Sequence, residues 1–156
     1  MDMFDSMFSQ SGSLNEQIAR HVFEIVPEGG PILVIIDREG NCWPSDSERF
    51  TSLHISESFL KDLRDKIDDG DEPIVTQIGE HSVVTSQLCT EHTNCGYVLI
   101  VLPEQGPEST MKNIDLIEMV LGQVSLAAKL IEKNNLLYEL QMKHNTSYVP
   151  GEVTLN

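Results

Sequence analysis

One long stretch near the C-terminus constrains the fold of this chain more than any other feature. From Asn113 to His144 the sequence contains no proline and only one glycine, Gly122. Apolar residues recur there at alternating steps of four and three, which is the heptad spacing of a helix that packs along one face. A helix of about 30 residues is roughly 45 Å long, more than a domain of this size needs. We expect its first half to pack on the domain and its second half to project and pair.

The heptad positions predict the residues of a homodimer interface. These residues are Ile117, Leu121, Val124, Ala128, Ile131, Asn135 and Tyr138, and Met142 continues the series. A second apolar stripe lies beside the first and contains Leu116, Val120, Ala127, Leu130 and Leu137. Asn135 interrupts the first stripe. A buried Asn there fixes the register and partner number of paired helices, and the alternative is that the helix has already left the interface at this point.

Length and charge narrow the class of protein. The 156 residues fit one domain with a sizeable core. Twenty-five acidic residues against ten Lys and Arg give a formal net charge of −15, which phosphate backbones and anionic lipid surfaces repel. We therefore expect no binding to nucleic acid or membrane. The acidic start of the chain, the odd number of cysteines (three) and the absence of a long apolar run predict a cytoplasmic protein.

The remaining sequence predicts two shorter helices and about five strands. Ser13 and Glu16 form a capping box at the start of the first helix, and Ser56 is the expected N-cap of the second. The run from Ile32 to Ile36 is rich in β-branched residues and continuous, as in a strand buried on both faces. The predicted elements are a helix over 13–26, strands at 31–37 and from Cys42, a helix over 57–69, and strands over 74–78, 81–88 and 95–102.

These elements define an α+β fold. It consists of a central antiparallel sheet of about five strands, flanked by an N-terminal helix and the long C-terminal helix. We expect residues 1–12 to be a flexible N-terminal segment, residues 13–144 to form the domain, and residues 145–156 to be a tail or linker.

Three stretches carry a resemblance to the GAF family of sensory domains, which are structural relatives of PAS domains. Ile32–Asp37 with the following Arg38-Glu39-Gly40 resembles the first GAF strand and its turn. Cys95–Val101 is similar to a late GAF strand, and Asn113–Leu140 is similar to the terminal helix that continues into a signalling coiled coil. The resemblance implies a dimerising regulatory domain that binds a small ligand or a partner protein. The roadblock/longin-type scaffold shares this order of elements, also works by dimerising, and is the structural alternative.

One loop contains residue types that could carry chemistry. Cys89, His92 and Cys95 follow a C-x2-H-x2-C spacing, which can present sulfur and nitrogen donors to Zn²⁺ or iron. Cys42 is a possible fourth ligand, and Cys89 with Cys95 could instead form a redox pair. The alternative is that the cysteines are small buried apolar residues and that His92 is an ordinary loop residue.

Motifs for catalysis are missing from the sequence. It contains no G-x-S-x-G elbow, no H-E-x-x-H and no phosphate-binding glycine loop. An enzyme related to the GAF-type methionine sulfoxide reductases remains an alternative, since Cys89 and Cys95 partly match its loop cysteines. The predicted function is therefore a sensory or regulatory domain without catalysis, with a metal or redox sensor and a protein-interaction scaffold as alternatives.

Overall fold

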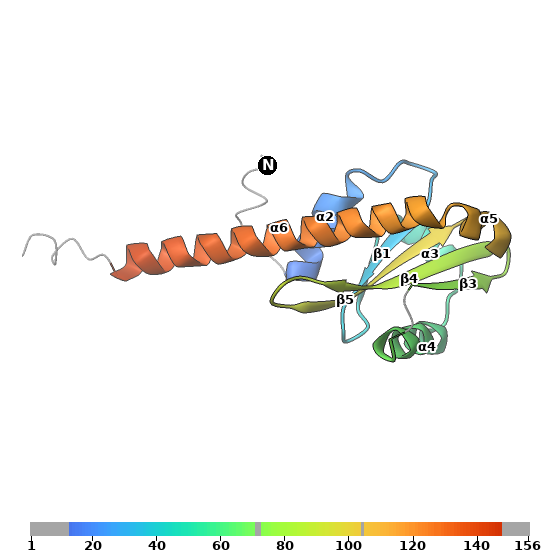
Figure 1. The fold of residues 1–156 in the computed structure, drawn as a ribbon, viewed down its shortest axis with the longest axis horizontal. Coiled ribbons are helices and arrows are strands. Elements are labelled where there is room, and N and C mark those ends of the chain that lie inside the picture. The colour runs from blue at the N-terminus through green and yellow to red at the C-terminus, as the bar shows by residue number, and fades with distance from the viewer. Residues whose placement is uncertain (1–12, 71–72, 104, 148–156) are drawn as a thin grey trace, which may run out of the picture.

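A five-stranded antiparallel sheet with helices on both faces forms the body of the protein, as the computed structural model shows (Figure 1). The structure describes residues 13–70, 73–103 and 105–147. The elements in chain order are α2 (Leu14–Phe23), β1 (Ile32–Ile36), β2 (Cys42–Pro44), α3 (Ser47–Ser52), α4 (Glu57–Asp68), β3 (Ile74–Ile78), β4 (His81–Cys89), β5 (Asn94–Leu102), α5 (Pro107–Lys112) and α6 (Ile114–Ser147). The strands lie in the order β2-β1-β5-β4-β3, and every neighbouring pair is antiparallel. The predicted α+β class is confirmed.

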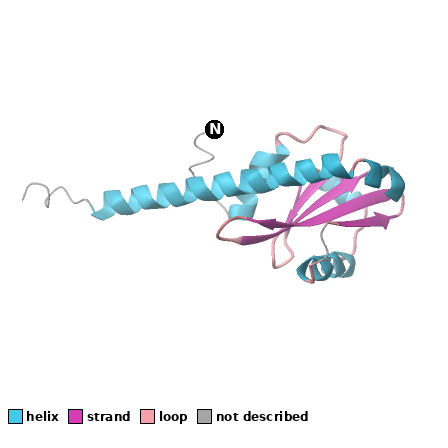
Figure 2. Cartoon of the chain, in the orientation of Figure 1, coloured by secondary structure: helices cyan, strands magenta, loops and turns pink. Residues whose placement is uncertain are grey.

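Helices lie on both sides of the sheet (Figure 2). The sheet therefore separates two apolar layers. Successive side chains of a strand point to opposite faces, so β1 contributes to both layers. Leu33 and Ile35 pack towards α2 and α6, whereas Ile32, Val34 and Ile36 pack towards α4. All five residues of β1 are buried, which confirms the prediction of a strand covered on both faces.

Helix α2 begins where its capping residue predicts. The Ser13 side chain accepts a hydrogen bond from the backbone N–H of Glu16 at 3.2 Å, and Ile18 and Val22 are buried. The helix ends at Phe23 and not at residue 26. The N–H groups of Ile25 and Val26 bond to carbonyls three residues back, so the chain tightens into a turn before Pro27.

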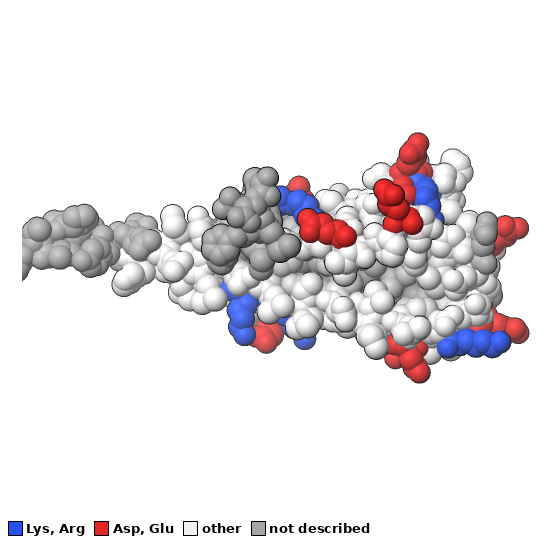
Figure 3. Space-filling view, turned by 90° about the horizontal axis from the view of Figure 1, so that it is seen from above, with Lys and Arg blue, Asp and Glu red and all other residues white. Residues whose placement is uncertain are grey.

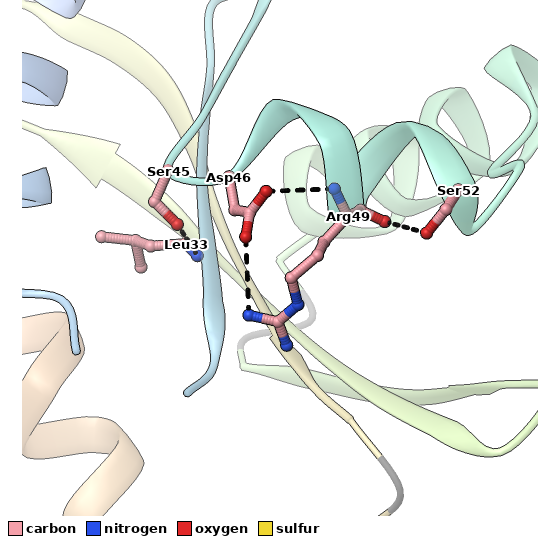
Figure 4. A network of polar contacts seen from close by, with 5 residues as sticks. All are labelled: Leu33, Ser45, Asp46, Arg49 and Ser52. Carbon is pink, nitrogen blue, oxygen red and sulfur yellow. Dashed lines mark hydrogen bonds and ion pairs between the residues drawn. The ribbon is translucent and has the colours of Figure 1, made fainter. Parts of the chain in front are cut away.

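The short helix α3 follows β2 directly and was not predicted from the sequence (Figure 4). The Ser45 hydroxyl accepts from the Leu33 N–H at 2.9 Å and extends the contact between the two strands. The Asp46 carboxylate then caps α3 by accepting from the Arg49 N–H at 3.0 Å, and it also forms an ion pair with the Arg49 guanidinium at 3.7 Å. The Ser52 hydroxyl donates to the Arg49 carbonyl at 2.6 Å.

Helix α4 covers the face of the sheet opposite α2 and α6 (Figure 1). Ser56 caps it by accepting from the Phe59 N–H at 3.1 Å, as predicted. The Tyr97 hydroxyl of β5 donates to the Asp68 carboxylate at 2.8 and 2.9 Å, and so fastens the last turn of the helix to the sheet. Burial and this bond raise the pKa of Tyr97 to about 12.

The long predicted helix is confirmed as α6, and the short helix α5 that precedes it was not predicted from the sequence. Helix α6 continues to Ser147, three residues beyond the predicted end at 144. It crosses the sheet with its first half and extends well past it with its second half (Figure 1). The segment predicted over 1–12, and residues 148–156 of the predicted tail, lie outside the described residues.

Candidate functional site

One face of α6 belongs to the core of the chain itself. Ile117, Val124, Ala128 and Ile131 are buried, with at most 7% of any of them exposed, and they pack with α2 and the sheet. These four are among the seven residues predicted for the dimer interface. The other three, Leu121, Asn135 and Tyr138, are partly buried. The predicted heptad stripe is therefore largely an intramolecular contact, and its four buried residues are not accessible to a partner in this structure.

A second face of α6 is apolar and exposed. Leu116, Leu137 and Leu140 are 60%, 55% and 62% exposed. We define the exposed face of α6 as Leu116, Met119, Val120, Leu126, Leu130, Leu136, Leu137 and Leu140. Viewed from the α6 side, charged side chains lie mainly at the margins and an uncharged band runs between them (Figure 3). So many large exposed apolar side chains on one helix are typical of an interaction site.

A groove lies between α2 and the first half of α6. Its volume is about 520 Å³. Its walls are almost entirely apolar, with His21 and Gln123 among the few polar residues. Apolar residues of this α2–α6 groove include Ile25, Val26, Leu33, Leu102, Val120 and Ala127. Four residues belong both to the groove and to the exposed face, so the two surfaces are continuous: Leu116, Val120, Leu126 and Leu130.

The hairpin between β4 and β5 is attached to α6 at the point where the helix leaves the sheet. The buried Glu132 carboxylate accepts hydrogen bonds from the hydroxyls of Thr90 and Thr93, both at 2.6 Å, and from the His92 backbone N–H at 3.3 Å. We call these four residues the hairpin clamp. No sequence motif indicated it, because its two parts lie about 40 residues apart along the chain.

The charge of Glu132 is stabilised by these contacts. Burial alone would raise the pKa of the carboxyl group, since it disfavours the charged form. The hydrogen bonds from Thr90 and Thr93, with that from the His92 backbone, outweigh burial and lower the pKa of Glu132 below its ordinary value. The carboxylate is therefore ionised at neutral pH and acts as an acceptor only.

Helix α2, which lies on the same face of the sheet as α6, is also bonded to β5 near this hairpin. The Asn15 side chain donates to the Cys95 carbonyl at 2.6 Å. The next residue, Gly96, has a φ of +119°, and a side chain there would collide with the Ile36 carbonyl of β1. Glycine at this position thus allows β5 to approach β1 closely.

The structure does not assemble the metal site predicted at Cys89, His92 and Cys95. Among the described residues, no group of three or more His, Cys, Asp and Glu side chains is placed to hold a metal. Cys95 is buried beneath α2 and α6, whereas His92 is exposed on the loop. Cys42, the proposed fourth ligand, packs in the layer on the opposite face of the sheet. The three residues therefore do not share one loop, because Cys89 ends β4, Cys95 lies in β5 and only His92 lies between the two strands.

The redox prediction concerns Cys89 and Cys95, which form no disulfide in this structure. Burial, and then the negative charge of Glu132, raise the pKa of the Cys95 thiol to about 12. The thiolate is the reactive form of cysteine, so Cys95 is poorly suited to nucleophilic or redox chemistry at neutral pH. The alternative interpretation of this cysteine, a small buried apolar residue, fits its surroundings.

Comparisons of the chain with known protein families, with curated proteins and with solved structures give no match. Within the part of the chain that the structure describes, no helix combines the length and apolar content required to cross a membrane. The features that bear on function are therefore the exposed face of α6, the α2–α6 groove and the hairpin clamp.

Proposed function

We propose that this chain is a dimerising regulatory domain of the GAF/PAS-like sensory type, and that it acts through protein–protein contact without catalysis of its own. GAF domains, which the sequence resembles, and the roadblock/longin scaffold, which shares the order of elements, both act as dimers, so the dimerising part of the proposal follows from either. The cysteine loop, which would have favoured a metal or redox sensor, does not form a ligand set with the other described residues.

The observation that carries the proposal is the exposed face of α6. It presents eight large apolar side chains, each at least 39% exposed, on one helix. Burying apolar surface contributes about 25 cal/mol per Å², so a helix face of this kind gains substantially when a second surface covers it. Most charged side chains seen from this side lie at its margins, as at the rim of a typical interface (Figure 3). The exposed Lys133 is the exception, since its helical spacing places it beside Leu130, Leu136 and Leu137.

Solution mass tests the proposal. Light scattering on the full chain at tens of micromolar should give twice the mass of the 17.5 kDa chain. The substitution Leu137→Glu places a charge in the exposed face without touching the core. We expect it to weaken the dimer by about 30-fold or more, as truncation or charging of a central interface residue commonly does.

Thr51→Glu is the matched control, because Thr51 is an exposed helical residue on the other side of the sheet. This variant adds the same charge and should leave the dimer intact. A wild-type chain that stays monomeric, or a Leu137→Glu variant that dimerises as tightly as the wild type, would contradict the proposal.

A second candidate function is the binding of a small apolar molecule in the α2–α6 groove. Its volume of about 520 Å³ lies within the range of roughly 300–1,000 Å³ typical of small-molecule sites, and its walls are apolar. Titration with 1-decanol, a neutral apolar probe, should perturb the NMR signals of Leu102 and Val120 and not those of Val83 on the opposite face of the sheet. Equal shifts at all three residues would indicate non-specific partitioning and exclude the groove as the site.

A further inference from the structure

The eight apolar residues that define the exposed face of α6 are arranged symmetrically about Ala128, whereas Met142, which is 49% exposed on the same helix, has the partly buried Ile114 as its counterpart. Leu126 and Leu130 lie two positions on either side of Ala128, and Leu116 and Leu140 lie twelve positions on either side. The intermediate residues pair in the same way, Val120 with Leu136 at eight positions and Met119 with Leu137 at nine. Ala128 itself is fully buried against the core on the opposite side of the helix. The face therefore presents the same pattern when it is read in either direction.

A surface with this property fits a copy of itself turned end to end. In a two-fold symmetric contact, residue i of one copy meets residue j of the other, and residue j meets residue i. We propose that the exposed face of α6 binds the α6 of a second copy in antiparallel orientation, with the two-fold axis beside Ala128. This inference rests on the proposed function, and it specifies the partner and the geometry of that dimer.

The antiparallel arrangement explains why the second half of α6 projects. Leu137 and Leu140 of one copy would lie over Met119 and Leu116 of the other, next to the partner's α2–α6 groove. Each projecting half would thus cover apolar surface that its partner cannot cover for itself. Two α6 helices and two α2 helices would then form the helical layer between the sheets.

The charges along α6 favour the same orientation. The helix begins with Asp115 and Glu118 and ends with Lys143 and His144. An antiparallel pair brings Asp115 of each helix near Lys143 and His144 of the other, although Glu139 then comes level with Ile117, next to Glu118. A parallel pair places every charge beside the same charge of the partner. Lys133 lies five positions from Ala128, opposite Gln123 in the antiparallel pair. In a parallel pair it would face the same lysine of the partner.

Opposite charges introduced at two symmetric positions of α6 distinguish the antiparallel from the parallel dimer. Leu116→Glu and Leu140→Lys, made separately, should each weaken the dimer by at least about 10-fold, since each puts a charge into an apolar contact. The double variant carries both substitutions in one chain. In the antiparallel dimer it forms two opposite-charge pairs, so it should recover at least about 10-fold over the weaker single variant, and the recovery should fall as salt rises. In a parallel dimer it should be weaker than either single variant.

The double variant Leu116→Glu with Leu140→Glu is the matched control, because it brings like charges together in the antiparallel arrangement. It should dimerise more weakly than either of its component single variants. Recovery equal to that of the opposite-charge variant would show that a general change in the helix, and not pairing across the axis, restores the dimer, and would overturn the inference.

Spin labels give an independent measurement. With Cys42 and Cys89 replaced by alanine and the buried Cys95 retained, Leu140→Cys carries one label per chain. Residues 140 of the two copies lie 24 positions apart along an antiparallel pair, so we expect them about 36 Å apart, against roughly 10 Å in a parallel pair. A dimer with the short distance would overturn the antiparallel geometry and leave the proposed function standing. A wild-type chain that remains monomeric would overturn both.

Discussion

The two halves of α6 carry similar apolar spacing but differ in what covers them. In the first half, Ile117, Val124, Ala128 and Ile131 pack into the core, and the hairpin clamp at Glu132 marks the end of that contact. The exposed face of α6 runs along both halves, but from Lys133 to His144 no residue is buried on any side of the helix. Heptad periodicity thus identifies a helix face that must be covered by other apolar residues. Whether those residues come from the same chain or from a partner depends on where the sheet lies.

Truncating one apolar residue in each half of α6 should give the largest difference in the free energy of unfolding. Ile131→Ala removes a core side chain that is 3% exposed, and we expect a loss of about 3 kcal/mol in the free energy of unfolding. Leu137→Ala should change it by less than about 0.5 kcal/mol when the chain is diluted to the monomer. Urea unfolding of both variants measures these values. Equal losses would mean that the second half also packs on the domain.

Removal of the clamp should have an intermediate effect. Glu132→Ala eliminates three hydrogen bonds to the hairpin, and we expect a loss of about 1–3 kcal/mol. Glu139, one of the exposed residues of the second half, provides the control, and Glu139→Ala should cost less than about 0.5 kcal/mol. A clamp variant as stable as the control would show that the hairpin is held by other contacts.

The contribution of the clamp should depend on pH. The pKa of Glu132 is lowered in the folded state from its ordinary value of 4.5, so the folded protein binds this proton less readily than the unfolded chain. Its stabilisation is therefore complete well above pH 4.5 and is lost as the pH falls through the lower pKa of the folded state. The difference in unfolding free energy between the wild type and Glu132→Ala should shrink from about pH 7 to about pH 3, and a constant difference would contradict this account.

The smallest effect concerns the reactivity of the cysteines near the boundary between the halves. Cys95 is buried with a pKa of about 12, and Cys89 is only partly buried. Iodoacetamide should modify Cys95 at least about tenfold more slowly than Cys89, as peptide mass spectrometry would show. Glu132→Ala should speed the labelling of Cys95 if the clamp keeps α6 seated over it. Rapid labelling in the wild type would mean that the first half of α6 lifts from the sheet.

The sequence was sufficient for most of the fold because local signals agreed with tertiary packing. Ser13 and Ser56 cap helices where predicted, and the buried run of β1 lies inside the sheet. Helix α3 was missed because its six residues bury no side chain and so carry no apolar period. The helix starts at the Asp46 cap, but a capping residue without a following apolar pattern does not predict a helix by itself.

Less of the candidate site could be predicted from the sequence. Periodicity correctly placed Val124 and Ala128 on one face of the helix, but it could not tell a core face from an interface. The neighbouring stripe with Leu116 and Leu137 had been recognised as apolar, and only the position of α2 and the sheet shows that it is the open one. Cys89 and Cys95 are close along the chain, yet Cys95 is buried beneath α2 and α6 while Cys89 is partly buried at the end of β4, next to an irregularity in strand register that no sequence motif marks.

The clamp at Glu132 also has a mechanical consequence. Its hydrogen bonds fix α6 to the β4–β5 hairpin at the point where the helix leaves the sheet. The rest of the helix can therefore tilt only about this point. From Glu132 to Ser147 the helix extends for about 22 Å, and a tilt of roughly 10° at this point would carry the far end through about 4 Å. A small displacement of the β4–β5 hairpin would thus be magnified, along a rigid lever, into a movement comparable to the spacing between packed side chains.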